Sequence, residues 1–241
     1  MVGHRGWPTA EHGENTLASL DAALHAGADG VEVDVRLTRD QVAVCCHDSN
    51  LSRLAGVDVD LTDLTWAALR TIALPPGHRI ARLVDVVDLV AQRGQLVLDL
   101  KMDNRPTALV EQTLAALPVG SCPDDLVVSS FHDPVLDELA GMRPQLSRAR
   151  IVDDDEAVVP ALAAALDRGD DALHLPVRTA LDDPVALRSV LDAGRAVRAW
   201  TVNRPVDARL CEAIGVAAVI TDRPADLLAA TRPLVGTSPV R

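Results

Sequence analysis

Three carboxylates occur in an alternating pattern within two short apolar segments of the sequence. Glu32 and Asp34 lie two positions apart in the segment 31–35, and Asp99 lies in the segment 96–101. Residues two positions apart in a strand point to the same side, so Glu32 and Asp34 share a face. Three carboxylates facing one interior could not all stay ionised without a compensating charge. A divalent cation with oxygen ligands would supply it, and Mg²⁺ or Ca²⁺ fits these donors better than zinc.

Two histidines and two cationic side chains occur at the ends of the same kind of segment. His4 ends the first apolar segment and His47 ends the third, and histidine transfers protons near neutral pH. Arg5 and Lys101 offer positive charges that suit a phosphate. Together with an oxygen-ligated cation, these groups favour in-line displacement at phosphorus. The cation would neutralise developing charge, one histidine would activate the nucleophile, and the other would protonate the leaving alcohol.

The elements that must position these residues alternate along the chain. Short β-branched segments are separated by Ala- and Leu-rich segments, a pattern typical of a parallel sheet covered by helices. The predicted strands are 2–4, 30–37, 42–47, 95–100, 126–130, 148–152, 172–175, 196–202 and 217–221. The predicted helices are 16–26, 84–91, 107–117, 134–142, 158–167, 184–193, 205–214 and 225–231.

The nine predicted strands form eight repeating units once the third strand is set apart. Only 38–41 separates the second strand from the third, and a parallel crossover needs about a dozen residues. These two strands must therefore form an antiparallel hairpin. The remaining β-then-α units predict an α/β fold, a single (β/α)8 TIM barrel over 1–233, with a short polar tail at 234–241 and a small cap at 51–80. An open doubly wound sheet is the alternative, but no glycine-rich phosphate loop follows the first strand.

Length and composition agree with one barrel. The chain has 241 residues, 48% of them hydrophobic, and a formal net charge of -12. This acidic balance excludes a protein that holds nucleic acid or anionic lipid through its general surface. No apolar run reaches the roughly 18 residues of a membrane-spanning helix. The N-terminal residues lack signal-peptide features and the four cysteines lack CxxC spacing, so we expect a cytoplasmic location.

Ten short motifs occur in order along nearly the whole chain. They are His4-Arg5-Gly6, Glu14-Asn15-Thr16, Glu32-x-Asp34, His47-Asp48, Leu51-x-Arg53, 64–69, Asp99-x-Lys101, Ser130-Phe131, Trp200-Thr201-Val202-Asn203 and Ile220-Thr221-Asp222. Each is weak alone, but in this order they resemble the successive motifs of glycerophosphodiester phosphodiesterases. The resemblance implies a TIM barrel and metal-dependent cleavage of glycerophosphodiesters to an alcohol and sn-glycerol 3-phosphate.

The resemblance also implies a role for each group named above. His4 and His47 would be the catalytic pair, Arg5 a phosphate ligand, Lys101 a cation that binds phosphate or positions the nucleophile, and Glu32, Asp34 and Asp99 the metal ligands. Asp99 departs from the pattern, because the family usually has Glu at this position. The shorter side chain leaves open the preferred ion, and an Asp99–Lys101 ion pair without a metal role is the alternative.

Further residues are predicted near the mouth of the barrel. Trp200 and Phe131 end predicted strands, where they either wall the pocket against the glycerol or alcohol group or simply pack. His132 and His174 also lie near strand ends, with either a pocket role or a structural one. We interpret Glu14 as an acidic residue in the first turn of a helix, where the helix dipole favours it. Positioning of the neighbouring cation or of the substrate is its alternative role.

The sequence therefore predicts a metal-dependent phosphodiesterase that acts on a small glycerophosphodiester, with no nucleic-acid partner and no membrane insertion. Because the cap offers little apolar surface for an acyl chain, deacylated diesters are favoured over intact lipids. One alternative is a lysophospholipase D or sphingomyelinase D-like activity in the same superfamily. Another is a catalytically weakened barrel that only binds phosphodiesters or metal. The nucleophile is either water or the glycerol 2-hydroxyl.

Overall fold

Eight parallel strands close into a barrel in the computed structural model, which describes residues 1–118 and 126–231. Strand β1 pairs with both β2 and β9, and this pairing closes the sheet. The barrel prediction is confirmed, and the predicted tail at 234–241 lies outside the described residues. In order around the barrel, the strands are β1 (Val2–His4), β2 (Gly30–Leu37), β4 (Gln95–Leu100), β5 (Leu126–Ser130), β6 (Ser147–Ile151), β7 (Ala172–Pro176), β8 (Ala196–Trp200) and β9 (Ala218–Thr221).

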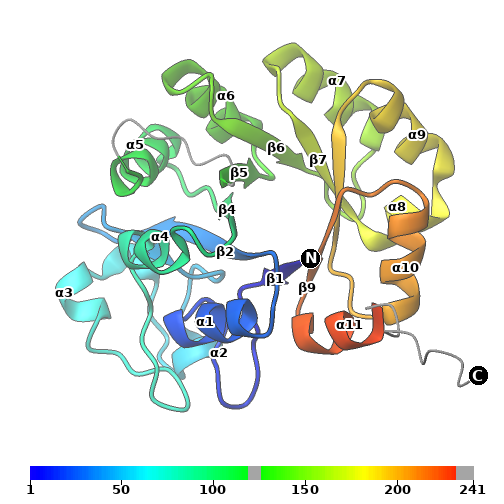
Figure 1. The fold of residues 1–241 in the computed structure, drawn as a ribbon. Helices are drawn as coiled ribbons and strands as arrows, with labels where there is room; N and C mark the ends of the chain where they lie inside the picture. The colour runs from blue at the N-terminus through cyan, green and yellow to red at the C-terminus, as the bar shows by residue number, and fades with distance from the viewer. Residues whose placement is uncertain (119–125, 232–241) are drawn as a thin grey trace, which may run out of the picture.

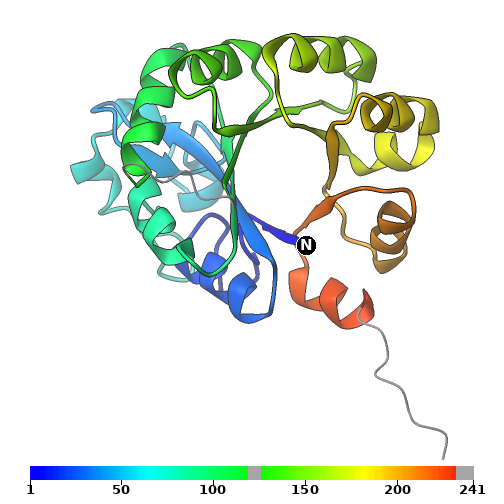
Figure 2. The same cartoon turned by 45° about the horizontal axis from the view of Figure 1, so that its top comes forward.

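Helices surround the strands as a ring (Figures 1 and 2). The eight predicted helices are all present, as α1 (Leu17–His25), α4 (Leu83–Val90), α5 (Pro106–Ala116), α6 (Asp133–Met142), α7 (Val158–Arg168), α9 (Pro184–Asp192), α10 (Pro205–Ala213) and α11 (Pro224–Thr231). A short extra helix, α8 (Val177–Asp182), follows β7 directly and was not predicted. It is too short to show a helical repeat in the sequence. None of the described helices is both long and apolar enough to cross a membrane.

Alternation along the strands separates the two faces of the barrel wall. In β2, the three valines at 31, 33 and 35 are buried in an apolar core against the helices, so Glu32 and Asp34 face the barrel interior. This first core extends over β4, β5, α1, α4, α5 and α6. A second core lies between β7 and β8 and the helices α7, α9, α10 and α11. The predicted placement of the two carboxylates on one interior face is therefore confirmed.

Strand β6 carries buried charges on the face where its neighbours carry apolar side chains. Arg148 donates to Asp170 Oδ1 at 3.2 Å and to three backbone carbonyls at 2.9 to 3.1 Å. Arg168 of α7 donates to Asp170 Oδ1 at 3.2 Å and to Asp170 Oδ2 at 2.7 and 3.0 Å. Arg150 bonds Asp133 and Glu156. We call Arg148, Arg150, Arg168 and Asp170 the β6 charge cluster, and it separates the two apolar cores.

The predicted hairpin and small cap are also present. Strand β3 (Ala43–Cys45) runs antiparallel to β2, and the cap that follows contains α2 (Ser52–Ala55), the 3₁₀ helix η1 (Leu61–Asp63) and α3 (Trp66–Leu69). The cap has an apolar cluster of its own, built on Leu51, Leu61 and Leu69. In Figure 1 it lies in cyan beside α1 and α4. Its position next to α1 brings α2 to the rim of the barrel mouth.

Candidate active site

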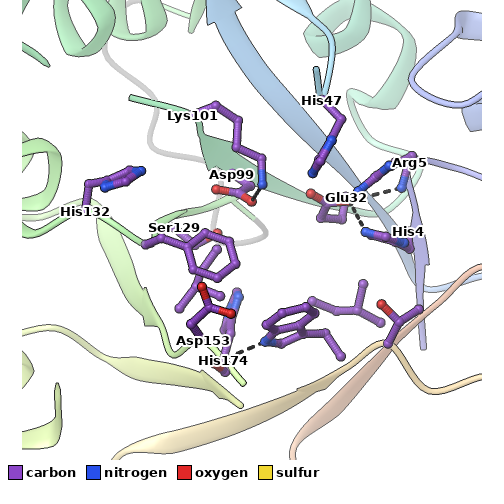
Figure 3. A pocket seen from close by; sticks show the side chains of 15 residues that line it. His4, Arg5, Glu32, His47, Asp99, Lys101, Ser129, His132, Asp153 and His174 are labelled. Carbon is purple, nitrogen blue, oxygen red and sulfur yellow. Dashed lines mark hydrogen bonds and ion pairs between the residues drawn. The ribbon is translucent and has the colours of Figure 1, made fainter. Parts of the chain in front are cut away.

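The carboxyl ends of the strands enclose a cavity of about 440 Å³ (Figure 3). Ten of the twelve residues predicted for the site line this cavity: His4, Arg5, Glu32, His47, Asp99, Lys101, Phe131, His132, His174 and Trp200. Of the remaining two, Asp34 is completely buried beside Glu32 and Asp99, and Glu14 lies behind Arg5. Strand register explains the convergence, because Glu32 pairs with His4 across β1 and β2, and Asp34 pairs with Asp99 across β2 and β4.

The three predicted metal ligands form a compact acidic group. Glu32, Asp34 and Asp99 each offer an oxygen, and these oxygens lie within 4.8 Å of one another. Burial and the charge of Asp34 raise the pKa of Glu32 to about 7, and burial raises the pKa of Asp99 to about 6. Asp99 Oδ1 is buried and bonds to no other described residue. Crowded carboxylates with an unpartnered oxygen are a donor set that fits a divalent cation.

Two cations already compensate part of this negative charge. The ammonium of Lys101 bonds Asp99 and lies 3.1 Å from Asp34 Oδ1, and Arg5 Nε lies 3.1 Å from Asp34 Oδ2. Burial alone would raise the pKa of Asp34, but Lys101 and Arg5 outweigh it and lower that pKa. The Asp99–Lys101 ion pair, which was the alternative to a metal role for Asp99, is thus present together with the acidic group. Three carboxylates face two fixed cations here.

Each of the two predicted catalytic histidines is held by a carboxylate at Nδ1. His4 Nδ1 lies 2.6 Å from Asp222 Oδ1, and His47 Nδ1 lies 2.8 Å from Asp48 Oδ1. Because an ionised carboxylate only accepts hydrogen bonds, each ring carries a hydrogen on Nδ1. Nε2 of each ring is therefore not bonded to Asp222 or Asp48, although Nε2 of His4 lies 3.9 Å from Glu32 Oε2, and both rings line the cavity.

The surroundings of the two histidines displace their pKa values in opposite directions. Burial lowers the pKa of His4, but the hydrogen bond to Asp222 and the charge of Glu32 outweigh it, so the pKa is raised. Burial also lowers the pKa of His47, with the charges of Arg5 and Lys101 acting in the same direction. The charge of Asp34 and the hydrogen bond to Asp48 do not compensate these effects, so that pKa is lowered. Pairs of titratable groups displaced in this manner are typical of acid–base sites.

The turn after β1 uses an unusual backbone to bring these groups together. Arg5 and Gly6 have φ values of 56° and 88°, and Asn15 also has a φ of 56°. A Cβ at Gly6 would lie 2.4 Å from Ser19 Oγ, so only glycine fits there. The turn places the backbone N–H of Arg5 3.0 Å from Glu32 Oε2. Positive φ is costly for residues other than glycine, so the surrounding contacts must hold this geometry.

Glu14 occupies a different place from the one we predicted. Helix α1 begins after Thr16, whose side chain accepts from the backbone N–H of Ser19, and its first turn contains no acidic residue. The first-turn interpretation of Glu14 is therefore wrong, because the residue that caps the start of α1 is Thr16, two residues after Glu14. Glu14 instead accepts hydrogen bonds from Arg5 at 3.0 Å and from Arg53 at 2.7 and 2.8 Å.

The opposite wall of the cavity is formed by the ends of β5 to β8 (Figure 3). Phe131 and Trp200 meet edge to face with their ring centroids 5.6 Å apart. Burial lowers the pKa of His174 well below its usual value, with the charge of Arg198 acting in the same direction. His132 lies near the outer edge of this wall.

Sequence reasoning missed several residues that support or line the site. Asn15 donates to Asp34 at 2.7 Å, and Asn203 donates to Asp222 at 2.7 Å. Asn15, Asn203, Asp222 and Arg53 all lie within the ten motifs, but a motif does not show which side chains will meet in the fold. Asp153, which lines the cavity, lies in the loop after β6 and belongs to none of those motifs.

Comparisons with known proteins agree with this geometry. A probable glycerophosphodiester phosphodiesterase 1 of Mycobacterium tuberculosis is 30% identical over 93% of this chain and 89% of its own length. The crystal structure of a glycerophosphodiester phosphodiesterase from Thermotoga maritima is 29% identical, with a TM-score of 0.79 over 95% of this chain and 96% of that one. A phosphodiesterase of Oleispira antarctica, solved in complex with the product sn-glycerol-3-phosphate, shares the fold at 24% identity, with a TM-score of 0.84 and 95% coverage of each chain.

The family model for glycerophosphoryl diester phosphodiesterases matches residues 4–226. This match begins at His4, ends in α11, and so includes the whole barrel mouth and every predicted site residue. The closed barrel, the cavity at its carboxyl end and the similar proteins all agree with it. The chain belongs to the glycerophosphoryl diester phosphodiesterase family of hydrolases.

Proposed function

We propose that this chain hydrolyses small glycerophosphodiesters to an alcohol and sn-glycerol 3-phosphate, with Mg²⁺ or Ca²⁺ held by Glu32, Asp34 and Asp99. One observation carries the proposal: an acidic group with an unpartnered buried oxygen lies in the same cavity as two carboxylate-bound histidines. The product sn-glycerol-3-phosphate in the Oleispira antarctica structure supports the same substrate class.

Each group has a place in the proposed reaction. Glu32, Asp34 and Asp99 would hold the divalent cation, whose charge would offset the negative charge that develops on the phosphoryl oxygens. Arg5 and Lys101 bind and orient the phosphodiester through charge-assisted hydrogen bonds. One histidine accepts at Nε2 the proton of the nucleophile, which is either water or the glycerol 2-hydroxyl, and the other donates a proton from Nε2 to the departing alcohol oxygen. Asp48 and Asp222 keep both rings in the tautomer that this exchange needs.

The size of the cavity, about 440 Å³, favours a small substrate. Phe131 and Trp200 supply an apolar wall of two rings, and we assign them to contact with the glycerol or alcohol group. His132 and His174 line the same side, where we assign them to shaping the cavity. Glycerol-based head groups are small enough to be covered by these side chains, so deacylated diesters are the expected substrates.

The test is metal-dependent release of sn-glycerol 3-phosphate. The purified chain is incubated with glycerophosphocholine or glycerophosphoethanolamine in Mg²⁺, Ca²⁺ or EDTA, with lysophosphatidylcholine as the competing substrate class. We expect release with one or both cations, none in EDTA, and loss of release in His4→Ala. Equal release in EDTA would contradict the metal role, and preferred cleavage of lysophosphatidylcholine would favour a lysophospholipase D. No release under any condition would overturn the proposal.

A second substrate decides between the two nucleophiles. A glycerophosphodiester with hydrogen in place of the glycerol 2-hydroxyl cannot form a cyclic phosphate. Full turnover of this substrate would show that water attacks directly. Loss of turnover with retained binding would show that the 2-hydroxyl attacks first.

A further inference from the structure

The cap contributes a guanidinium group to the rim of the barrel mouth. Arg53 of α2 donates from Nη1 and Nη2 to the two oxygens of Glu14, at 2.8 and 2.7 Å, and from Nε to Asp48 Oδ2 at 2.6 Å. Glu14 precedes α1 and Asp48 follows β3, so one side chain of the cap holds two segments of the barrel. A planar guanidinium presents its donors in the fork that such an arrangement requires.

Both carboxylates that Arg53 binds have a second partner inside the cavity. Glu14 Oε1 accepts from Arg5 Nη1 at 3.0 Å, and Asp48 Oδ1 lies 2.8 Å from His47 Nδ1. Five side chains therefore form a continuous series, in which each carboxylate joins two hydrogen-bond donors, from the proposed phosphate-binding cation Arg5 to the proposed catalytic histidine His47. We call Arg5, Glu14, Arg53, Asp48 and His47 the rim chain. Its two ends line the cavity, whereas Arg53 lies in an adjoining surface groove beside His47.

We propose that Arg53 is a positioning residue that sets His47 and Arg5 relative to each other through Asp48 and Glu14. The inference rests on the proposed function, because it takes His47 as a group that transfers a proton and Arg5 as a group that binds the phosphodiester. The cap then takes part in the reaction without touching the substrate. Residues behind a reacting group commonly act in this way, and a displacement of about 1 Å costs about 10²-fold in rate.

The alternative role for Arg53 is to stabilise the cap, and the structure separates the two roles. The Arg53 side chain is 52% exposed, and exposed ion pairs contribute only about 0.2–1 kcal/mol to stability. The cap is held by its own apolar cluster around Leu51, Leu61 and Leu69. Loss of Arg53 should therefore leave the cap folded while freeing both carboxylates to rotate.

The first experiment compares Arg53→Gln and Arg53→Lys with Arg82→Gln. Arg82 is a matched control because it is 42% exposed, bonds Asp85 through two nitrogens and lies outside the cavity lining. We expect kcat/KM for glycerophosphocholine to fall about 10- to 100-fold in Arg53→Gln and to recover only in part in Arg53→Lys, because an ammonium cannot hold both carboxylates. Arg82→Gln should stay within about twofold of the wild type, since exposed pairs contribute little. Full activity of Arg53→Gln, or an equal loss in Arg82→Gln, would overturn the proposal.

Each branch of the rim chain has its own kinetic signature. Glu14→Gln cuts the branch to Arg5 and should mainly raise KM, whereas Asp48→Asn cuts the branch to His47 and should mainly lower kcat. If Arg53 acts through these carboxylates, adding Asp48→Asn to Arg53→Gln costs less than the product of the two single losses. Fully multiplicative losses would mean that Arg53 acts independently of Asp48, which contradicts the proposal.

An activity-independent measurement keeps this inference separate from the proposed function. ¹⁵N NMR of the histidine rings reports which nitrogen of His47 carries hydrogen. We expect the Nδ1–H form to dominate in the wild type and in Arg82→Gln, and a mixture of both tautomers in Arg53→Gln. An unchanged His47 tautomer in Arg53→Gln would overturn the positioning role even if no glycerophosphodiester were cleaved. Absence of substrate cleavage with the expected NMR change would instead count against the proposed function alone.

Discussion

The barrel buries two groups of charges, and they differ in how completely their hydrogen-bonding groups are used. In the β6 charge cluster, Asp170 receives bonds on both oxygens, and Arg148 donates to Asp170 and three carbonyls. In the acidic group of the mouth, Asp99 Oδ1 has no partner among the described residues. A satisfied cluster is complete within the protein, whereas an unsatisfied one has capacity left for a ligand.

This difference separates stability from function in physical terms. In a buried ion pair, each charge compensates for the hydration that the other has lost. Removing one member costs stability because the remaining charge is then buried without a partner. Crowded carboxylates that lack sufficient partners oppose folding until a cation arrives. We therefore expect substitutions in the β6 charge cluster to change stability and substitutions in the mouth to change activity.

The largest expected effect is on activity, in the mouth. His47→Ala should lower kcat about 10³-fold, or about 4 kcal/mol of barrier, because proton transfer by a positioned side chain contributes about 10²- to 10⁴-fold. The His47 side chain is 37% exposed, so its loss should change the free energy of unfolding by less than about 1 kcal/mol. Steady-state kinetics and urea unfolding check both halves. A large loss of stability here would erase the distinction between the two clusters.

An effect of comparable size, on stability and not on activity, is expected from a substitution in the β6 charge cluster. Asp170→Ala leaves the buried guanidinium groups of Arg148 and Arg168 without their shared carboxylate, which should cost about 3–5 kcal/mol of unfolding free energy. Asp137→Ala is the matched control, because Asp137 binds the same Arg168 but is 65% exposed, and it should cost less than about 1 kcal/mol. Urea unfolding measures both, and kcat of the folded Asp170→Ala protein should remain near the wild-type value. If the two variants were equally stable, the cluster would have no structural role.

A smaller effect is expected from Glu32→Gln in the absence of metal, where the substitution should increase the free energy of unfolding. Because the folded-state pKa of Glu32 is raised to about 7, the wild type loses stability as pH rises from the unfolded-state pKa near 4.5 through 7. Glutamine avoids this cost, so in EDTA the variant should exceed the wild type by about 1–3 kcal/mol at pH 8 and match it near pH 4.5. Urea unfolding at both pH values in EDTA tests this sign. A variant that is less stable than the wild type at pH 8 would show that the acidic group is already satisfied.

The smallest effect concerns the apolar wall of the mouth. Trp200→Ala should raise KM about two- to fivefold, corresponding to about 0.4–1 kcal/mol of lost contact with the glycerol or alcohol group. The kcat should change less, since Trp200 bonds none of the proposed acid–base groups. Unchanged KM and kcat would place Trp200 among the packing residues alone.

The sequence predicted the barrel and the convergence of the charged groups, because both depend on local periodicity. Alternation places Glu32 and Asp34 on one face, and short separations exclude parallel pairing of the hairpin. Arg148 and Arg150 were not predicted to be buried against the helices, since alternation does not show that carboxylates at the start of α6 and in the loops before and after α7 will meet them. The contact between Glu14 and Arg53 was likewise inaccessible, because it joins residues 39 positions apart through tertiary packing.

The charged face of β6 also has a consequence for how the barrel assembles. The buried members of the first apolar core all lie between residues 20 and 146, and those of the second between 152 and 227. Each core is therefore formed by a continuous stretch of chain, and β6 lies at the junction. Cooperative units of opening and closing commonly coincide with such contiguous, separately packed stretches. Amide hydrogen exchange should accordingly divide the barrel into two groups of protected strands, β2, β4 and β5 in one and β7 and β8 in the other.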